Sequence, residues 1–187
     1  WSGPQGKKIF CTYYSSRCGG TTTPAFNLSK EPLIPPLAGG VACACCRRSD
    51  AYRWPRDVTL SKEAIGERLA DRYQRFAELS AVDHLEIAEA MPDGRALRVR
   101  VVDDEGESAE LDAESFRLTV DPAGRTLQST YFQITDLSDS VLFAAGRGMG
   151  HGMGLCQYGA EYMARAGQNV TTILRHYYPK SQVTRAY

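Results

Sequence analysis

The middle of the chain has the two-residue period of a β-strand. Within residues 96–102, Leu97, Val99 and Val101 alternate with Arg98 and Arg100, which predicts a strand with one buried face. Residues 85–91 precede it, and the Asp93-Gly94 pair between them is typical of a tight hairpin turn. Residues 85–111 are therefore expected to form a hairpin-rich lobe. Further strands are predicted at 7–14, 108–111, 129–134 and 141–145.

Helical spacing appears on both sides of this region. A helix from the Ser61 cap to about Leu79 would place Ile65, Leu69 and Tyr73 on one face. A short helix is predicted from the Asp112 cap. Another is predicted over 154–166, where Gly167 stops it, and its apolar stripe is Leu155, Tyr158, Tyr162 and Met163. A last helix should run from the Asn169 cap to Pro179 and bury Ile173, Leu174, Tyr177 and Tyr178. The expected fold class is α+β, an antiparallel sheet with a few flanking helices.

The segment from Gly19 to Pro55 interrupts these patterns. It is rich in proline and glycine, and proline fixes φ and donates no hydrogen bond. A long irregular loop is expected here. Loops of this length in compact domains are usually functional or held by an additional constraint.

Composition excludes several classes of protein. The chain has 187 residues, 22 basic and 22 acidic, and therefore no net charge, whereas domains that bind nucleic acid are usually strongly basic. With 43% hydrophobic residues it is not expected to be disordered. It has no apolar run of the roughly 18 to 20 residues that span a bilayer and no visible signal peptide. Because the chain begins at Trp1 without methionine, it is interpreted as a fragment or a processed form.

The segment from Gly146 to Gly154 has glycine at every second position. In an extended conformation the glycines would share one face, which would let another backbone or a flat ligand approach, and Arg147 and His151 would share the other. Strict alternation does not match a dinucleotide-binding or phosphate-binding loop. Five glycines are entropically costly, and this favours a functional site over a simple turn.

Six cysteines raise the question of metal or disulfide chemistry. Cys43 and Cys46 have C-x-x-C spacing, and Cys18 precedes a Gly-Gly turn that could wrap a metal ion. Three thiolates and a fourth ligand would hold a structural zinc. A disulfide of Cys18 with Cys43 or Cys46, or free thiols, are the alternatives. Cys11 and Cys156 are expected to be buried packing residues.

Four blocks in order carry a resemblance to a known family. They are YSSRCGGTT at 14–22, the cysteine-bearing segment from Gly40 to Trp54, the section from Phe116 to Phe132, and GRGMGHGMGLCQYGA at 146–160 with ILRHYYP at 173–179. This order resembles the SpoIID/LytB family, whose prototype is a cell-wall lytic transglycosylase. The resemblance runs from about Lys7 to Pro179 and implies one SpoIID-like domain over residues 1–187, truncated at its N-terminus.

The resemblance implies cleavage of peptidoglycan glycan strands with formation of 1,6-anhydro-N-acetylmuramic acid ends. A carboxylic acid would protonate the leaving oxygen and then take the proton of the muramoyl 6-hydroxyl. His151 is the predicted catalytic residue, as a partner of the sugar or an orienter of the acid. The predicted substrate-binding residues are Arg147, which would hold a lactyl carboxylate, and Gln157, Tyr158 and Ser16. Some relatives bind zinc, which the resemblance permits at Cys18, Cys43 and Cys46.

One part of the family pattern has no counterpart in this chain. The family's catalytic glutamate lies in a V-x-x-E-x-P segment, and no such segment occurs in these 187 residues. The acid is therefore expected upstream of Trp1, together with any signal or anchor of an extracytoplasmic cell-wall protein. Partners implied by the resemblance are glycan strands, other cell-wall hydrolases and sporulation proteins. The alternatives are a catalytically silent glycan-binding module and a zinc-stapled structural domain.

Overall fold

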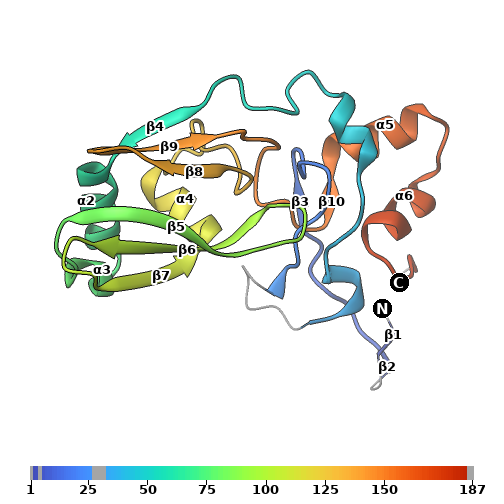
Figure 1. Cartoon of the computed structure of the whole chain (residues 1–187). Coiled ribbons are helices and arrows are strands. Elements are labelled where there is room, and N and C mark those ends of the chain that lie inside the picture. Colours follow the sequence, from blue (N-terminus) through green and yellow to red (C-terminus); the bar gives the residue numbers. More distant parts are fainter. Residues whose placement is uncertain (1, 4–5, 27–32, 185–187) are drawn as a thin grey trace. The chain divides into compact units, whose positions relative to one another are not determined.

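The computed structural model describes residues 2–3, 6–26 and 33–184 and divides the chain into two compact units. The first unit comprises Trp1–Tyr52 and Gly148–Tyr187, and the second comprises Arg53–Arg147 (Figure 1). Helices and antiparallel sheets in both confirm the α+β class. Among the described residues, no helix combines the length and apolar character needed to cross a membrane. That residues 1–187 form one domain with a hairpin-rich lobe at 85–111 stays a prediction.

The second unit contains two three-stranded antiparallel sheets. The predicted hairpin and third strand are confirmed, and Gly94 at the turn has a φ of 90°. One sheet has the order β4-β9-β8, formed by Val58–Ser61, Ser140–Ala144 and Gln133–Asp136. The other has the order β5-β6-β7, formed by Val82–Ala90, Ala96–Asp103 and Ser108–Asp112.

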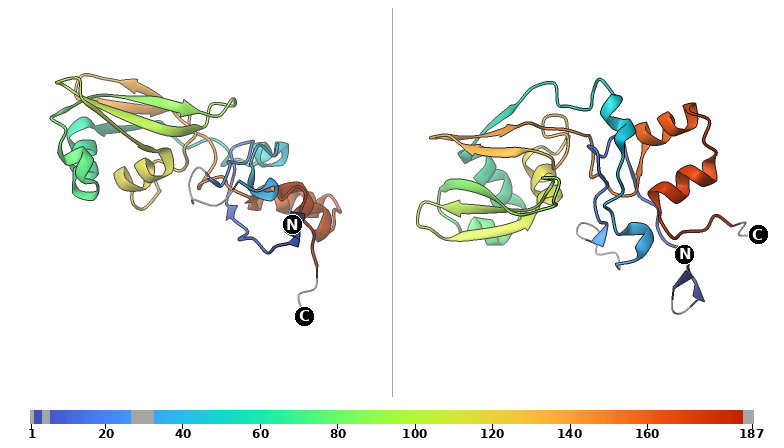
Figure 2. Two further views of the ribbon diagram at one scale, coloured as in Figure 1. Left: turned by 90° about the horizontal axis from the view of Figure 1, so that it is seen from below. Right: turned by 45° about the vertical axis from the view of Figure 1, so that its right-hand side comes forward.

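Helices α2 (Lys62–Arg72), α3 (Gln74–Ala77) and α4 (Ala113–Val120) lie on one side of these sheets (Figure 2). The predicted caps are confirmed, because Ser61 Oγ accepts from the Ala64 amide and Asp112 Oδ1 from the Ser115 amide. Apolar residues of both sheets and of the helices meet in one core. Its fully buried members include Ile65, Leu69, Val99, Val101, Phe116 and Phe143.

The first unit is built from short elements and loops. Strand β3 (Tyr14–Ser15) pairs in parallel with β10 (Leu155–Cys156), and β1 (Ser2–Gly3) pairs with β2 (Gly6–Lys7). The 3-10 helices are η1 (Pro35–Leu37) and η2 (Ala44–Arg48), and the α-helices are α5 (Gln157–Arg165) and α6 (Val170–Tyr177). The predicted Asn169 cap is confirmed, since its Oδ1 accepts from the Thr172 amide at 2.9 Å. The segment from Gly19 to Pro55 is irregular, as predicted, although 27–32 lie outside the described residues.

Several predicted elements are wrong in extent. The strand expected over 7–14 is reduced to its two ends, and Ile9 is 95% exposed, so its apolar pattern buries no face. The helix from Ser61 breaks at Tyr73, whose φ of −136° and ψ of 114° are extended. Strand β8 begins at Gln133 and not at 129. Helix α5 begins at Gln157, because Leu155 and Cys156 pair with β3 instead.

Candidate metal centre and glycine segment

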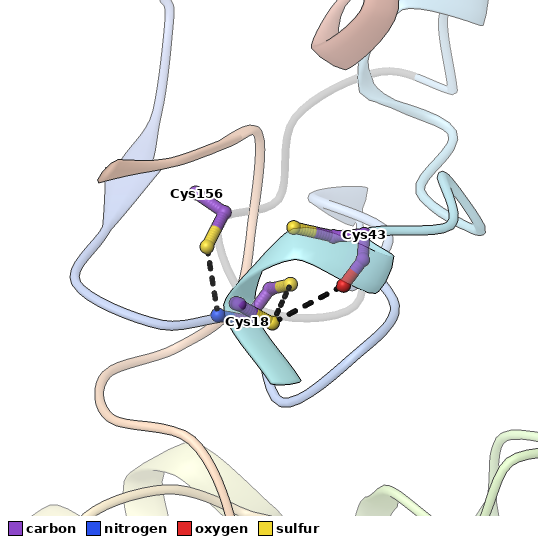
Figure 3. Close-up of side chains that lie close together, drawn as sticks. Cys18, Cys43 and Cys156 are labelled. Carbon is purple, nitrogen blue, oxygen red and sulfur yellow. Dashed lines mark hydrogen bonds between the residues drawn. The ribbon is translucent and has the colours of Figure 1, made fainter. Parts of the chain in front are cut away.

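Four buried cysteines of the first unit converge on one point (Figure 3). The Sγ atoms of Cys18, Cys43, Cys46 and Cys156 all lie within 4.8 Å of one another. They come from three separate segments of the chain: the turn after β3, the start of η2, and the junction of β10 with α5. These four residues are called the thiol cluster below.

The size of the thiol cluster fits a metal ion. Zinc–sulfur bonds of about 2.3 Å in a tetrahedron place neighbouring sulfurs about 3.8 Å apart. The Sγ atoms of Cys18 and Cys46 are 3.7 Å apart, close to this value and well beyond the about 2.05 Å of a disulfide bond. All six cysteines of the chain are free in the structure. The thiol cluster can therefore hold a metal ion, and four soft thiolates suit zinc or an iron–sulfur centre.

Donors surround the thiol cluster. The amides of Cys18 and Gly159 both donate to Cys156 Sγ at 3.4 Å, and the Tyr177 hydroxyl lies 3.1 Å from Cys43 Sγ. Burial raises the pKa of Tyr177, so its hydroxyl stays protonated and can donate to the sulfur. Such contacts favour thiolates over thiols and orient metal ligands.

Gly159 is required by this geometry. A Cβ at this position would lie 2.4 Å from Cys43 Sγ and 2.0 Å from the Tyr177 hydroxyl oxygen. Helix α5 approaches the cysteines closely because this residue has no side chain. The absence of a Cβ thus serves the thiol cluster, not the backbone conformation, since φ at Gly159 is not positive.

The four thiols of the cluster differ in the direction of their pKa shifts. Hydrogen bonding to Cys156 lowers the pKa of Cys43 and raises that of Cys18 and Cys46. Hydrogen bonding to Cys18 lowers the pKa of Cys156. Two thiols thus lose protons readily and two retain them, and a bound cation would take the place of the retained protons.

The structure brings Cys18, Cys43 and Cys46, the three ligands predicted from the sequence, to one point. It adds Cys156, which the sequence analysis assigned to packing; Cys156 is buried, but its sulfur belongs to the thiol cluster. No sequence spacing signals this residue, because it lies 110 positions after Cys46 and only the β3–β10 pairing brings it near. Cys11 was predicted to be buried and is exposed.

The glycine segment does not adopt the extended conformation in which its glycines would share one face. Gly148, Gly150, Gly152 and Gly154 all have positive φ between 63° and 92°, which side-chain-bearing residues rarely adopt. Isolated bridges connect Met149 to Arg17 and Met153 to Thr23. Backbone approach is confirmed at two of the glycines. A Cβ on Gly154 would lie 2.1 Å from the Tyr13 carbonyl oxygen, and one on Gly148 would lie 2.9 Å from that of Arg17.

His151 lies at the centre of this segment and is half-buried. Its Nδ1 accepts a hydrogen bond from the Met153 amide at 3.0 Å, and the ring meets Tyr13 edge-on at 6.3 Å between centroids. Because a backbone amide can only donate, Nδ1 carries no proton in this geometry. In the neutral ring the proton is therefore on Nε2, which makes Nε2 a donor.

Three of the predicted substrate-binding residues lie in the first unit with His151. Ser16 is half-buried, and its carbonyl accepts from the Tyr158 amide at 3.2 Å. Gln157 is exposed at the start of α5. The expected burial of Tyr158 within the apolar stripe of its helix is wrong, since this side chain is 42% exposed. Its ring instead carries the Arg17 guanidinium on one face, 4.6 Å from the centroid.

Arg147 belongs to the second unit. Its guanidinium lies over the Tyr131 ring, 4.1 Å from the centroid, and donates to the Asp93 carbonyl oxygen at 2.8 Å. Arg95 lies 4.2 Å from the centroid of the same ring, and the Tyr131 hydroxyl donates to Asp93 Oδ2. Burial raises the pKa of Tyr131 to about 12, so the hydroxyl remains a donor. Arg147 is thus engaged in local packing within its own unit.

Comparison with known families adds a classification to this geometry. The family described as "Domain of unknown function (DUF8618)" matches residues 44–154, which is more than half of the chain. The chain belongs to the DUF8618 family. The matched residues contain the whole second unit, Cys46 and the glycine segment, whereas the other three residues of the thiol cluster lie outside the match.

Individual relatives extend the comparison beyond DUF8618. An uncharacterized protein of Brachyspira hyodysenteriae is 30% identical over 171 residues, covering 91% of this chain and 42% of that protein. Stage II sporulation protein D of Bacillus subtilis is 48% identical over 60 residues, 32% of this chain and 17% of that protein. The amidase enhancer of Bacillus subtilis is 41% identical over 58 residues, 30% of this chain and 8% of that protein. The chain thus spans less than half the length of these relatives, and the local matches support a SpoIID-like relationship.

Proposed function

We propose that this chain is part of an extracytoplasmic protein that cleaves the glycan strands of peptidoglycan as a lytic transglycosylase. The observation that supports it most is the glycine segment, which holds His151 with Nε2 as a donor. The four ordered motifs and the local similarity to stage II sporulation protein D and the amidase enhancer support the same assignment.

In the proposed reaction a carboxylic acid protonates the glycosidic oxygen, and the C1–O bond breaks. The resulting carboxylate then takes the proton of the muramoyl 6-hydroxyl as its oxygen bonds to C1, so no water is consumed. His151 donates from Nε2 to a sugar oxygen or to the acid and orients it. Ser16, Gln157 and Tyr158 contribute hydroxyl and amide hydrogen bonds to the sugar. The acid is proposed to come from a segment outside these 187 residues.

We infer that the thiol cluster binds zinc as a structural ion. Zinc bound by Cys18, Cys43, Cys46 and Cys156 would join the turn after β3, the irregular segment and the start of α5. Structural zinc contributes directly to folding free energy. In this role the ion holds the backbone around the glycine segment and takes no part in the chemical step.

The proposal is tested by digestion of purified peptidoglycan with the full-length parent protein, followed by mass spectrometry of the products. Anhydro-muropeptides are expected from the wild type, and His151→Ala is expected to reduce their rate of formation by about 100-fold or more, in the range typical of acid–base partners. The control is His84→Ala, which should leave the rate unchanged. His84 is in the second unit, where its side chain contacts the exposed carboxylate of Asp83.

Three other outcomes would contradict this proposal. Binding of glycan without anhydro products would identify a catalytically silent glycan-binding module. An absence of glycan binding in the wild type and in His151→Ala alike would leave a zinc-stapled structural domain. Products with reducing ends in place of anhydro ends would show hydrolysis and overturn the transglycosylase mechanism.

A further inference from the structure

Arg17 lies in the first unit, immediately before Cys18 of the thiol cluster. Its backbone pairs with Met149 of the glycine segment in both directions, with N–O distances of 3.1 and 2.9 Å. The side chain is only 8% exposed. A buried cation is costly unless other groups compensate its charge, so the partners of this guanidinium are informative.

The partners of Arg17 are unevenly distributed. Nη1 donates to the Ala51 carbonyl oxygen at 2.7 Å. Within the described residues, Nη2 reaches only Met149 Sδ at 3.7 Å, and Nε is buried with no acceptor. Tyr158 covers one face of the guanidinium. Among the carboxylates of the described residues, none forms an ion pair with Arg17.

The two poorly satisfied donors lie on the same edge of the guanidinium. Nε–H and one Nη2–H point in parallel directions, and this edge binds both oxygens of a carboxylate in a bidentate pair. Here the edge holds a single thioether, which is a weak acceptor. Met149 is 38% exposed, and methionine has a flexible, unbranched side chain. An oxyanion can therefore displace its sulfur.

We propose that the Nε–Nη2 edge of Arg17 binds a sugar carboxylate, displacing Met149. In peptidoglycan this is the lactyl carboxylate of a muramic acid that carries no stem peptide, so the identity of the ligand rests on the proposed function. Arg147, which was predicted from the sequence to hold this carboxylate, donates to the Asp93 carbonyl oxygen in the second unit, and its role stays a prediction. Arg17 instead belongs to the same unit as His151 and Tyr158.

Tyr158, whose ring packs against the Arg17 guanidinium, also borders a hollow of the first unit. Tyr158 lines a hollow of about 410 Å³ in the first unit, within the range of about 300–1,000 Å³ for small-ligand sites. Tyr162 and Arg48 also line it, with the Arg48 guanidinium 4.9 Å from the Tyr162 ring centroid. Two tyrosines and polar side chains suit a sugar, which presents both apolar faces and hydroxyls.

The test compares three tetrasaccharides by isothermal titration calorimetry with the full chain. They are alternating N-acetylglucosamine–N-acetylmuramic acid with free lactyl acids, the same compound with lactyl amides, and chitotetraose. The wild type should bind the acid about 10- to 100-fold more tightly than the amide, because a charge-assisted bidentate pair is lost in the amide. Arg17→Gln should bind both equally, and Arg17→Lys should keep part of the preference. Binding of chitotetraose should not depend on the residue at position 17.

Arg175→Gln, an exposed arginine on α6 of the same unit, is the matched control and should keep the full preference. Equal binding of acid and amide by the wild type would overturn the inference, and this comparison needs no variant to fold. Retention of the preference in folded Arg17→Gln would overturn it as well. Glycan cleavage without an acid preference would overturn the Arg17 site alone. An acid preference without anhydro products would overturn only the proposed cleavage.

Discussion

At the level of single residues, small size or hydrogen bonding at one position allows other groups to come close together. Gly159 admits Cys43 and Tyr177 into a space that a methyl group would fill. Asp103, on β6, accepts amide hydrogen bonds on both carboxylate oxygens, from Ser80 on Oδ2 and from Glu105 and Glu107 on Oδ1. One carboxylate thus closes the turn between β6 and β7 and connects it to the segment before β5.

Asp103 predicts a specific dependence of stability on pH. The amide hydrogen bonds, chiefly that of Ser80, lower its pKa in the folded protein. A lowered carboxyl pKa contributes stability that is fully present above the unfolded pKa of about 3.9 and is lost as pH falls through the lower folded value. Asp103→Asn should therefore lower the melting temperature at pH 7 and reduce the further loss below pH 4. Thermal melts across pH 2–7 measure this.

The adjacent Asp104→Asn is the control, because Asp104 is exposed. It should resemble the wild type at every pH. If Asp103→Asn and wild type have parallel melting curves against pH, the assignment of acid sensitivity to this carboxylate is wrong.

At the scale of elements, the glycine segment is defined by its backbone and not by its side-chain pattern. Alternate positive φ values let the segment pass close to Tyr13 and Arg17 while placing His151 beside Tyr13. A regular strand would not give this path, because its residues have negative φ. The alternation in the sequence therefore corresponds to a positive φ that recurs at every second residue from Gly148 to Gly154.

Two glycine substitutions separate crowding from backbone strain. Gly154→Ala combines a φ of 63° with a Cβ 2.1 Å from the Tyr13 carbonyl oxygen, and we expect a loss of about 3 kcal/mol or more in the free energy of unfolding. Gly167→Ala has a φ of 83° but no atom within 4 Å of its Cβ, and should lose only about 1 kcal/mol. Urea unfolding measures both, and equal losses would show that the close approach carries no cost.

At the scale of the whole molecule, the two units differ in the interactions that stabilise each unit internally. The second unit has a continuous core of aliphatic and phenylalanine side chains from two sheets and three helices. The first unit has short strands, irregular segments and a smaller core that includes the thiol cluster. Small cores often depend on metal ions or disulfides for stability.

Metal removal should therefore affect the units unequally. Chelation of the proposed zinc at neutral pH is expected to abolish amide protection in the first unit and to leave that of β5, β6 and β7 in place, as measured by hydrogen exchange. Cys156→Ser should weaken zinc binding by more than about 100-fold, exceeding the effect of residues that only support metal ligands. Cys45→Ser is the control, since Cys45 is outside the thiol cluster. Equal zinc content in both variants would remove Cys156 from the ligand set.

The sequence was enough to predict the α+β class, the hairpin and third strand within 85–111, and the caps at Ser61, Asp112 and Asn169. These features depend on local rules, namely side-chain period, turn preference and capping hydrogen bonds. It also identified Cys18, Cys43 and Cys46 as a set and marked His151 through the glycines around it.

The folded structure, in contrast, was needed to see which distant groups meet. It brought Cys156 to the other three cysteines, engaged Arg147 with Tyr131 and Asp93, and buried Arg17 with a donor edge that meets no oxygen acceptor among the described residues. It also exposed Tyr158, although helical periodicity placed this residue in the apolar stripe. The contacts of Arg17 with Ala51, Arg147 with Asp93 and Cys18 with Cys156 join residues 34, 54 and 138 positions apart, so no local pattern of side chains records them.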